Sequence, residues 1–227
     1  MGERILIVDD EREIADLIAL YLENDGYTAV KAYSGAEALE IIESAAPALA
    51  ILDVMLPDTD GFALLRRIRQ SCTFPVIMLT ARVNDGDKIL GLTIGADDYI
   101  TKPFNPLEVT ARVKTVLRRC RPSGPKESNE IDVRGLVVNH DSHRCTLYGA
   151  PVQLTPIEFD ILWYLCSNRG RVIPSEELFE AVWKEKYLNN NNTVMAHIAR
   201  LRDKLGEPPR DPKFIKTVWG VGYEVEK

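Results

Sequence analysis

Short apolar runs alternate with helix-like spacings through the first half of the chain. Apolar runs predict strands at 5–8, 28–32, 48–52, 76–79 and 99–101. Between them, apolar positions recur three and four residues apart and predict helices around 14–21, 35–45, 61–70, 85–94 and 106–119. Because strands and helices alternate, we expect an α/β domain: a doubly wound, five-stranded parallel sheet with helices on both faces.

The pattern changes after residue 120. Residues 121–130 are rich in turn formers, show no periodicity and are predicted to form a linker. Beyond them, short strands are predicted at 136–139, 145–147 and 152–154, before three helices and a hairpin at 214–224. This order is typical of a winged helix-turn-helix domain. We therefore expect two domains, 1–120 and 131–227.

The predicted helices of the second half have recognisable starts and inward faces. Thr155-Pro156-Ile157-Glu158 has the N-cap, first-turn proline and third-position glutamate of a helix start. A second helix is expected from Ser175, and a third from about Thr193 to Leu205. The inward positions of the third helix are predicted to be Val194, Ile198, Leu201 and Leu205.

Composition narrows the class of protein. The 227 residues are 45% hydrophobic and 27% charged, as in a soluble globular protein. No apolar run reaches the roughly 18 residues of a membrane span, and the four cysteines lack CxxC spacing. We therefore expect a cytoplasmic protein without a membrane partner. The net charge of −6 belongs to residues 1–120, since residues 131–227 are neutral, so nucleic-acid binding would need a local basic patch.

Polar side chains follow four of the predicted strands. Asp9 and Asp10 come after the first strand, Asp53 after the third, Thr80 after the fourth and Lys102 after the fifth. The carboxyl ends of neighbouring parallel strands meet in one crevice, so these groups are expected to converge. Clustered carboxylates suit Mg²⁺, and an aspartate beside Mg²⁺ can accept a phosphoryl group. A single strand-end aspartate is more often a helix cap, but this order of groups favours an ionic site.

These residues, with Met55-Leu56-Pro57, Gly61 and Lys102-Pro103-Phe104, resemble the receiver domain of two-component response regulators. The resemblance implies that a partner histidine kinase phosphorylates Asp53. It implies Mg²⁺ held by Asp10 and Asp53, by Asp9 through water, and by the Met55 carbonyl. It also implies phosphoryl contacts from Thr80 and Lys102, a Thr80–Tyr99 switch pair, and a cis bond before Pro103.

The same resemblance implies that phosphorylation produces a homodimer through the last sheet edge. Its apolar centre would be Ile89, Leu92 and Ala111, and its ion pairs Lys88–Glu108, Asp97–Arg112 and Asp98–Arg119. From the residues alone, a solvated charged face is the simpler explanation, because exposed ion pairs contribute little individually.

Residues 136–226 resemble the DNA-binding domain of the OmpR/PhoB subfamily, through 154–159, 193–205 and 217–223. The resemblance implies promoter DNA and RNA polymerase as partners. On the third helix, Thr193, His197, Arg200, Arg202 and Lys204 are expected to face outward, with Lys216 and Thr217 in the hairpin as further DNA contacts. Arginine can read guanine, and threonine and lysine can contact phosphate. By itself, such a mixed-charge helix is usually a solvated face.

Two positions depart from the subfamily pattern. Many relatives have arginine where Ala199 and Trp219 stand. Trp219 is expected either to pack on a sugar–phosphate or to belong to the domain core. The stretch 219–223, with features near the start of the chain, is similar to regulators of the vancomycin-resistance type (VanR-like), which implies control of glycopeptide-response genes.

Two other functions remain possible from the sequence. An aspartate-dependent phosphatase would share the aspartate, Mg²⁺, threonine and lysine, but it needs an acid two residues after the nucleophile, where Met55 stands. A phosphorylation-independent DNA-binding regulator would usually lack one of the acids or the lysine, and none is missing. We therefore predict a phosphorylation-switched transcriptional regulator that is not an enzyme.

Overall fold

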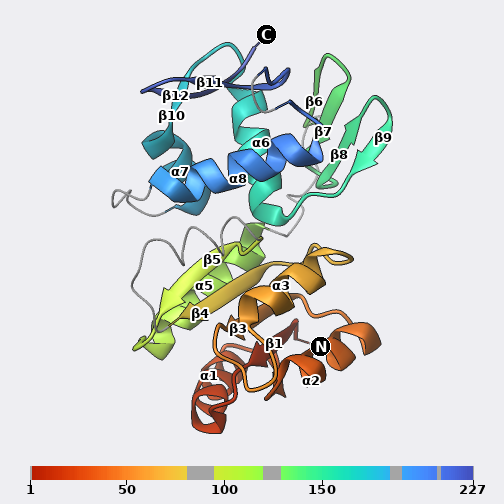
Figure 1. The fold of residues 1–227 in the computed structure, drawn as a ribbon. Helices are drawn as coiled ribbons and strands as arrows, with labels where there is room; N and C mark the ends of the chain where they lie inside the picture. Colours follow the sequence, from red (N-terminus) through yellow and green to blue (C-terminus); the bar gives the residue numbers. More distant parts are fainter. Residues whose placement is uncertain (1, 81–94, 120–128, 185–190, 209–210, 227) are drawn as a thin grey trace. The chain divides into compact units, whose positions relative to one another are not determined.

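The chain forms two compact units, 1–118 and 119–227, which are described separately. The computed structural model describes residues 2–80, 95–119, 129–184, 191–208 and 211–226 (Figure 1). The predicted helix around 85–94 and most of the predicted linker lie outside the described residues.

The first unit contains a five-stranded parallel sheet, as the sequence predicts. Its strands are β1 (Arg4–Val8), β2 (Thr28–Ala32), β3 (Leu49–Asp53), β4 (Val76–Thr80) and β5 (Asp98–Thr101). Their order across the sheet is β2-β1-β3-β4-β5. From β1, the chain first runs to β2 on one side and then crosses back to β3 on the other side. In such a sheet, the crevice at the carboxyl ends of β1 and β3 is the usual place for a ligand.

Helices cover both faces of this sheet (Figure 1). They are α1 (Arg12–Asn24), α2 (Gly35–Ser44), α3 (Gly61–Arg69) and α5 (Pro106–Arg119). Ile5 and Ile7 of β1 pack with α1 and α5 on one face, and Leu6 and Val8 pack with α2 and α3 on the other. Successive strand residues point to opposite faces, so continuous apolar strands build two cores.

The described residues of the second unit form two small sheets and three helices. One sheet contains β6 (Glu130–Val133), β7 (Leu136–Asn139), β8 (Arg144–Leu147) and β9 (Ala150–Val152). The other contains β10 (Ile173–Pro174), β12 (Gly222–Val225) and β11 (Ile215–Val218), in that order. The helices are α6 (Pro156–Ser167), α7 (Ser175–Trp183) and α8 (Asn191–Lys204), and α6 contacts both other helices as well as β6 and β12.

Several local predictions for this unit are confirmed, and others are wrong. Glu158 accepts a hydrogen bond from the backbone N–H of Thr155 at 2.8 Å, so α6 has the predicted capped start. The strand predicted at 152–154 instead ends at Val152, because Thr155 is already the N-cap of α6. Strands β6 and β10 were not predicted. They are short, and their hydrogen bonds to partner strands define them better than any apolar pattern.

Candidate functional site

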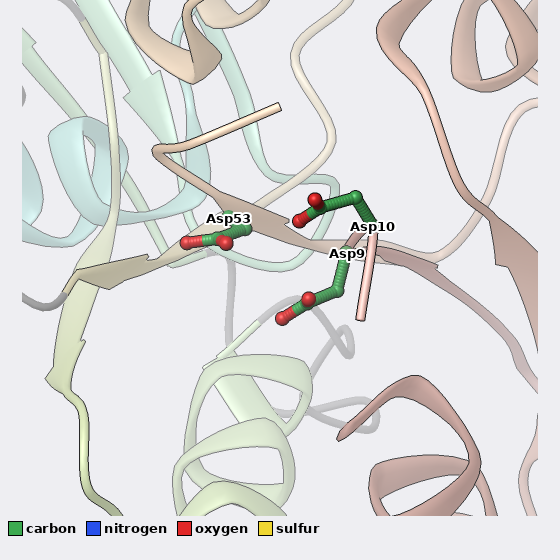
Figure 2. Close-up of side chains that lie close together, drawn as sticks. All are labelled: Asp9, Asp10 and Asp53. Atoms are coloured by element: carbon green, nitrogen blue, oxygen red, sulfur yellow. The ribbon is translucent and has the colours of Figure 1, made fainter. Parts of the chain in front are cut away.

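Three carboxylates gather at the ends of β1 and β3. Asp9 and Asp10 directly follow β1, and Asp53 is the last residue of β3. One oxygen from each lies within 4.8 Å of the others, and Figure 2 shows Asp9 and Asp10 extending toward the side on which Asp53 lies. Asp9 and Asp53 are buried, whereas Asp10 is exposed. The site is therefore open to solvent at Asp10 and closed behind it.

Lys102 supplies positive charge to this cluster. It follows β5, and its Nζ donates to Asp9 Oδ2 at 2.8 Å and to Asp53 Oδ2 at 3.0 Å. It also lies 3.7 Å from Glu11 Oε1. One ammonium group thus faces several carboxylates, which leaves the cluster with a net negative charge that suits a hard cation.

Burial and Lys102 shift the pKa of Asp53 in opposite directions. Burial raises the pKa of Asp53, and the hydrogen bond and charge of Lys102 lower it, with a net upward shift. For Lys102, burial lowers the pKa, but the hydrogen bonds and charges of Asp9 and Asp53 together raise it. The ammonium group is therefore charged at neutral pH and remains paired with the two carboxylates.

The other predicted residues of this site lie around the cluster. Thr80 ends β4 and is buried, and the half-buried Tyr99 of β5 packs against the core on the α2/α3 face. Met55 is exposed in the connection between β3 and α3, and its backbone N–H donates to the Asp53 carboxylate. The bond between Lys102 and Pro103 is cis, as predicted.

The predicted dimer surface is only partly assembled by the described residues. Lys88, Ile89 and Leu92 lie outside them, as does the side chain of Arg119, and Ala111 is exposed on α5. Arg112 binds Asp98 at 2.9 Å and Glu108 at 3.1 Å within one chain. Asp97 was predicted to pair with Arg112 in the dimer. In the single chain its side chain is 1% exposed and is bound by Arg69 at 2.8 Å.

The outward face predicted for α8 also needs correction. Val194, Ile198, Leu201 and Leu205 are buried as predicted, but Thr193 and His197 are buried too. Helix α8 contacts both α6 and α7, so it buries a wider arc than a single apolar stripe. The ring of His197 lies 5.5 Å from that of Trp183 and accepts a hydrogen bond from Arg200. Neither Thr193 nor His197 is presented to solvent.

Two carboxylates that hold predicted site residues were missed by sequence reasoning. Glu158, fully buried, lies 3.5 Å from Arg200 and accepts a hydrogen bond from Lys204 at 2.6 Å. Glu226 pairs with Lys216. Arg202, by contrast, donates to the backbone carbonyl of Ile215 at 3.0 Å and to the Thr217 hydroxyl at 2.8 Å. The helix-start motif at 155–158 marked Glu158 as a cap, but no sequence signal shows which cations reach it.

Comparisons with known proteins agree with both halves of this picture. Residues 5–114 match the response regulator receiver domain, and residues 149–225 match the family described as transcriptional regulatory protein, C terminal. The chain is 60% identical to the regulatory protein VanRc of Enterococcus gallinarum and 54% identical to VanR of Enterococcus faecium, over the full length of each. The chain belongs to the two-component response regulators.

More distant relatives place this response regulator in the OmpR/PhoB subfamily. It is 41% identical to the alkaline phosphatase synthesis regulator PhoP of Bacillus subtilis, with 100% of this chain and 98% of PhoP covered. The crystal structure of DrrB, a Thermotoga maritima OmpR/PhoB homologue, is 32% identical with a TM-score of 0.53, and both chains are covered completely. The response regulator thus combines a receiver with a winged-helix DNA-binding domain and acts as a two-component transcriptional regulator. Among its described residues, none of the helices is long and apolar enough to cross a membrane.

Proposed function

We propose that Asp53 of this response regulator accepts a phosphoryl group from a sensor histidine kinase and thereby controls promoter binding. The observation that carries the proposal is the position of the Asp53 carboxylate at the carboxyl end of β3, where it accepts from Lys102 and lies within 4.8 Å of Asp9 and Asp10. That position combines a nucleophile, a cation and an open side in one crevice.

Three converging oxygens with one paired lysine fit a divalent cation. Asp9, Asp10 and Asp53 would hold Mg²⁺, together with the backbone carbonyl of Met55, and the ion supplies positive charge next to phosphoryl oxygens. Lys102 would bind a phosphoryl oxygen on the other side, since its ammonium already reaches Asp53. The Thr80 hydroxyl, at the end of the neighbouring strand, would donate to a third oxygen.

The phosphoryl transfer replaces one bond to phosphorus with another. An Asp53 carboxylate oxygen attacks phosphorus, a P–O bond forms, and the P–N bond to the kinase imidazole breaks. The imidazole keeps the bonding electrons and takes up a proton from solvent. Asp53 must be ionised for this attack, and Lys102, which lowers its pKa against the effect of burial, favours that form.

We further propose that phosphorylation acts through Thr80 and Tyr99 on the surface formed by α5 and β5. Asp98, Glu108 and Arg112 already form one ion-pair network there, through which a change at Tyr99 can reach this surface. A homodimer would then present two winged helices to promoter DNA, where RNA polymerase is recruited. Similarity to VanRc and VanR supports glycopeptide-response genes as the targets.

Intact-protein mass spectrometry after a brief incubation with acetyl phosphate and Mg²⁺ tests the acceptor. Asp53→Asn should abolish labelling. Asp16→Asn, which removes an exposed carboxylate of α1 in the same unit, should label normally. Labelling of the Asp53 variant at the wild-type level would refute the assignment. Beryllofluoride with Mg²⁺ should raise the dimer fraction of the wild type in sedimentation, but not that of Asp53→Asn.

A further inference from the structure

The arginines of α8 are used inside their own domain. Arg202 is bound to the Ile215 carbonyl and the Thr217 hydroxyl, which ties α8 to β11. The Arg200 side chain is only 14% exposed and is held by Glu158 and His197. A guanidinium group that reads guanine needs its paired N–H donors free for the base edge. In this arrangement both groups hold α8 to the rest of its own domain.

Among the described side chains early in α8, from Thr193 to Ala199, the exposed ones are apolar. Met195 is 56% exposed, and Ala199, one helical turn further on, is also exposed. Each follows an inward residue, Val194 or Ile198, by one position, so both lie outside the buried stripe of the helix. The early residues of a recognition helix are the ones that approach base edges in the major groove.

The tip of the β11–β12 hairpin is apolar as well. Trp219 is 90% exposed in the turn, so it does not belong to the domain core, and Val221 next to it is half exposed. Gly220 between them has φ +74°, a conformation that glycine adopts without strain in a tight turn. Together with Val221 and Met195, the exposed indole offers an apolar surface that gains free energy when a partner covers it.

A hollow of about 470 Å³ lies next to these two features. Met195 and Trp219 both line it, together with Ser175 and Glu176 at the start of α7. Among the described residues that line the hollow, Glu176 is the only charged one. A phosphate group would meet no cation in this lining and one acid, so the hollow favours the apolar edges of nucleotides.

We propose that this response regulator reads its operator through apolar contacts: Met195 packs against thymine methyl groups in the major groove, and Trp219 packs against deoxyribose rings in the adjacent minor groove. The proposal rests on the DNA-binding function and names the chemistry of that interface. Thymine alone carries a methyl group in the major groove, so an apolar side chain can select it. Apolar side chains at a hairpin tip also enter the minor groove, where they exclude water from the sugars.

The probe is a duplex selected from random double-stranded DNA by the full-length wild-type chain with Mg²⁺ and beryllofluoride. Each thymine of that duplex is then replaced singly by deoxyuridine, which removes only the methyl group. At one or two positions we expect wild-type affinity to fall about fourfold, the loss expected for one buried methyl group. Met195→Ala should bind more weakly, and its affinity should no longer depend on those methyl groups, whereas Met195→Leu should retain the dependence.

Salt dependence tests the Trp219 contact. Trp219→Ala should lower affinity about tenfold on all duplexes, with an unchanged slope of log affinity against log salt, because an apolar contact releases no counterions. Lys216→Ala, by contrast, should reduce the slope by about one. Tyr148→Ala removes an exposed aromatic ring next to β8 in the same unit and should change neither quantity.

The outcomes separate this inference from the DNA-binding function. Failure of the wild-type chain to enrich any duplex would count against DNA binding itself, and with it this contact surface. Specific binding that is indifferent to every deoxyuridine replacement would overturn the role of Met195. Equal deoxyuridine losses in the wild type and Met195→Ala would overturn it as well. A changed salt slope or an unchanged affinity in Trp219→Ala would overturn the role of the indole.

Discussion

Lys204, in the last turn of α8, donates a 2.6 Å hydrogen bond to Glu158, which lies in the first turn of α6 and is fully buried. The same carboxylate caps the backbone of Thr155 and faces Arg200. One acid therefore joins the start of α6 to the last two turns of α8, and it fixes how α8 is rotated within its domain. The apolar DNA-facing side of α8 depends on this rotation.

Loss of Glu158 should destabilise the winged-helix unit strongly. Glu158→Ala leaves two cations and the Thr155 N–H without their acceptor, and we expect a loss of about 3–5 kcal/mol in unfolding free energy. Lys204→Met should cost less, about 1–3 kcal/mol, because Arg200 still faces the carboxylate.

Urea unfolding followed by tryptophan fluorescence measures these losses, since all three tryptophans, at 163, 183 and 219, belong to the winged-helix unit. Arg134→Ala, which breaks an exposed pair with Glu226, is the control and should cost under about 1 kcal/mol. Equal losses in all three variants would contradict the central role of Glu158.

Asp97 is expected to act on receiver stability rather than on dimerisation. Arg69→Met removes the partner of a buried carboxylate and should cost about 3–5 kcal/mol, measured by far-ultraviolet circular dichroism during denaturation. Asp97→Asn should also destabilise the unit, since the carboxylate accepts from the Val76 N–H at 2.9 Å as well as from Arg69. Beryllofluoride-induced dimerisation of the folded Asp97→Asn protein should match the wild type. Normal stability with impaired dimerisation would instead return Asp97 to the interface.

Removal of Lys102 should make the receiver depend on Mg²⁺ for stability. Lys102→Met leaves Asp9 and Asp53 close together with no ammonium between them, so the unit without metal should lose about 3 kcal/mol or more. Mg²⁺ restores positive charge to the cluster. Because Mg²⁺ binds the folded form and not the unfolded form, it stabilises the folded form.

The increase in melting temperature on adding Mg²⁺ should therefore be larger in Lys102→Met than in the wild type. Asp10→Asn combined with Lys102→Met should reduce this increase. An identical Mg²⁺ effect in the wild type and Lys102→Met would exclude competition between the lysine and the metal.

Two cysteines of the winged-helix unit should resist alkylation in the folded protein. Burial raises the pKa of the Cys145 thiol to about 11 and that of Cys166 to about 12. Only the thiolate reacts, so at pH 8 both groups stay protonated and shielded. Peptide mass spectrometry after an iodoacetamide pulse should find Cys72, which is half-buried, modified well before them. Modification of all three at one rate in native buffer would show that the core opens on the labelling timescale; in urea we expect the rates to converge.

The sequence itself determined the architecture and the composition of the receiver site. Apolar periodicity and strand-end chemistry are local properties, so the five-stranded sheet and the positions of Asp9, Asp10, Asp53 and Lys102 at strand ends could be predicted. The parallel arrangement then brings the strand ends together, because neighbouring parallel strands end at the same edge of the sheet.

The tertiary structure decided which charged side chains form pairs and which helix faces stay exposed to solvent. Asp97 pairs with Arg69, 28 residues away in the sequence, and Glu158 binds Lys204, 46 residues away. These pairs form because the packing of the helices decides which long side chains come within contact distance. Thr193 and His197 are buried because two helices, rather than one, cover α8. No periodicity in the sequence shows how many neighbours a helix has. For that reason the exposed Met195 and Trp219, with Arg200 and Arg202 held inside the domain, could be recognised only in the folded chain.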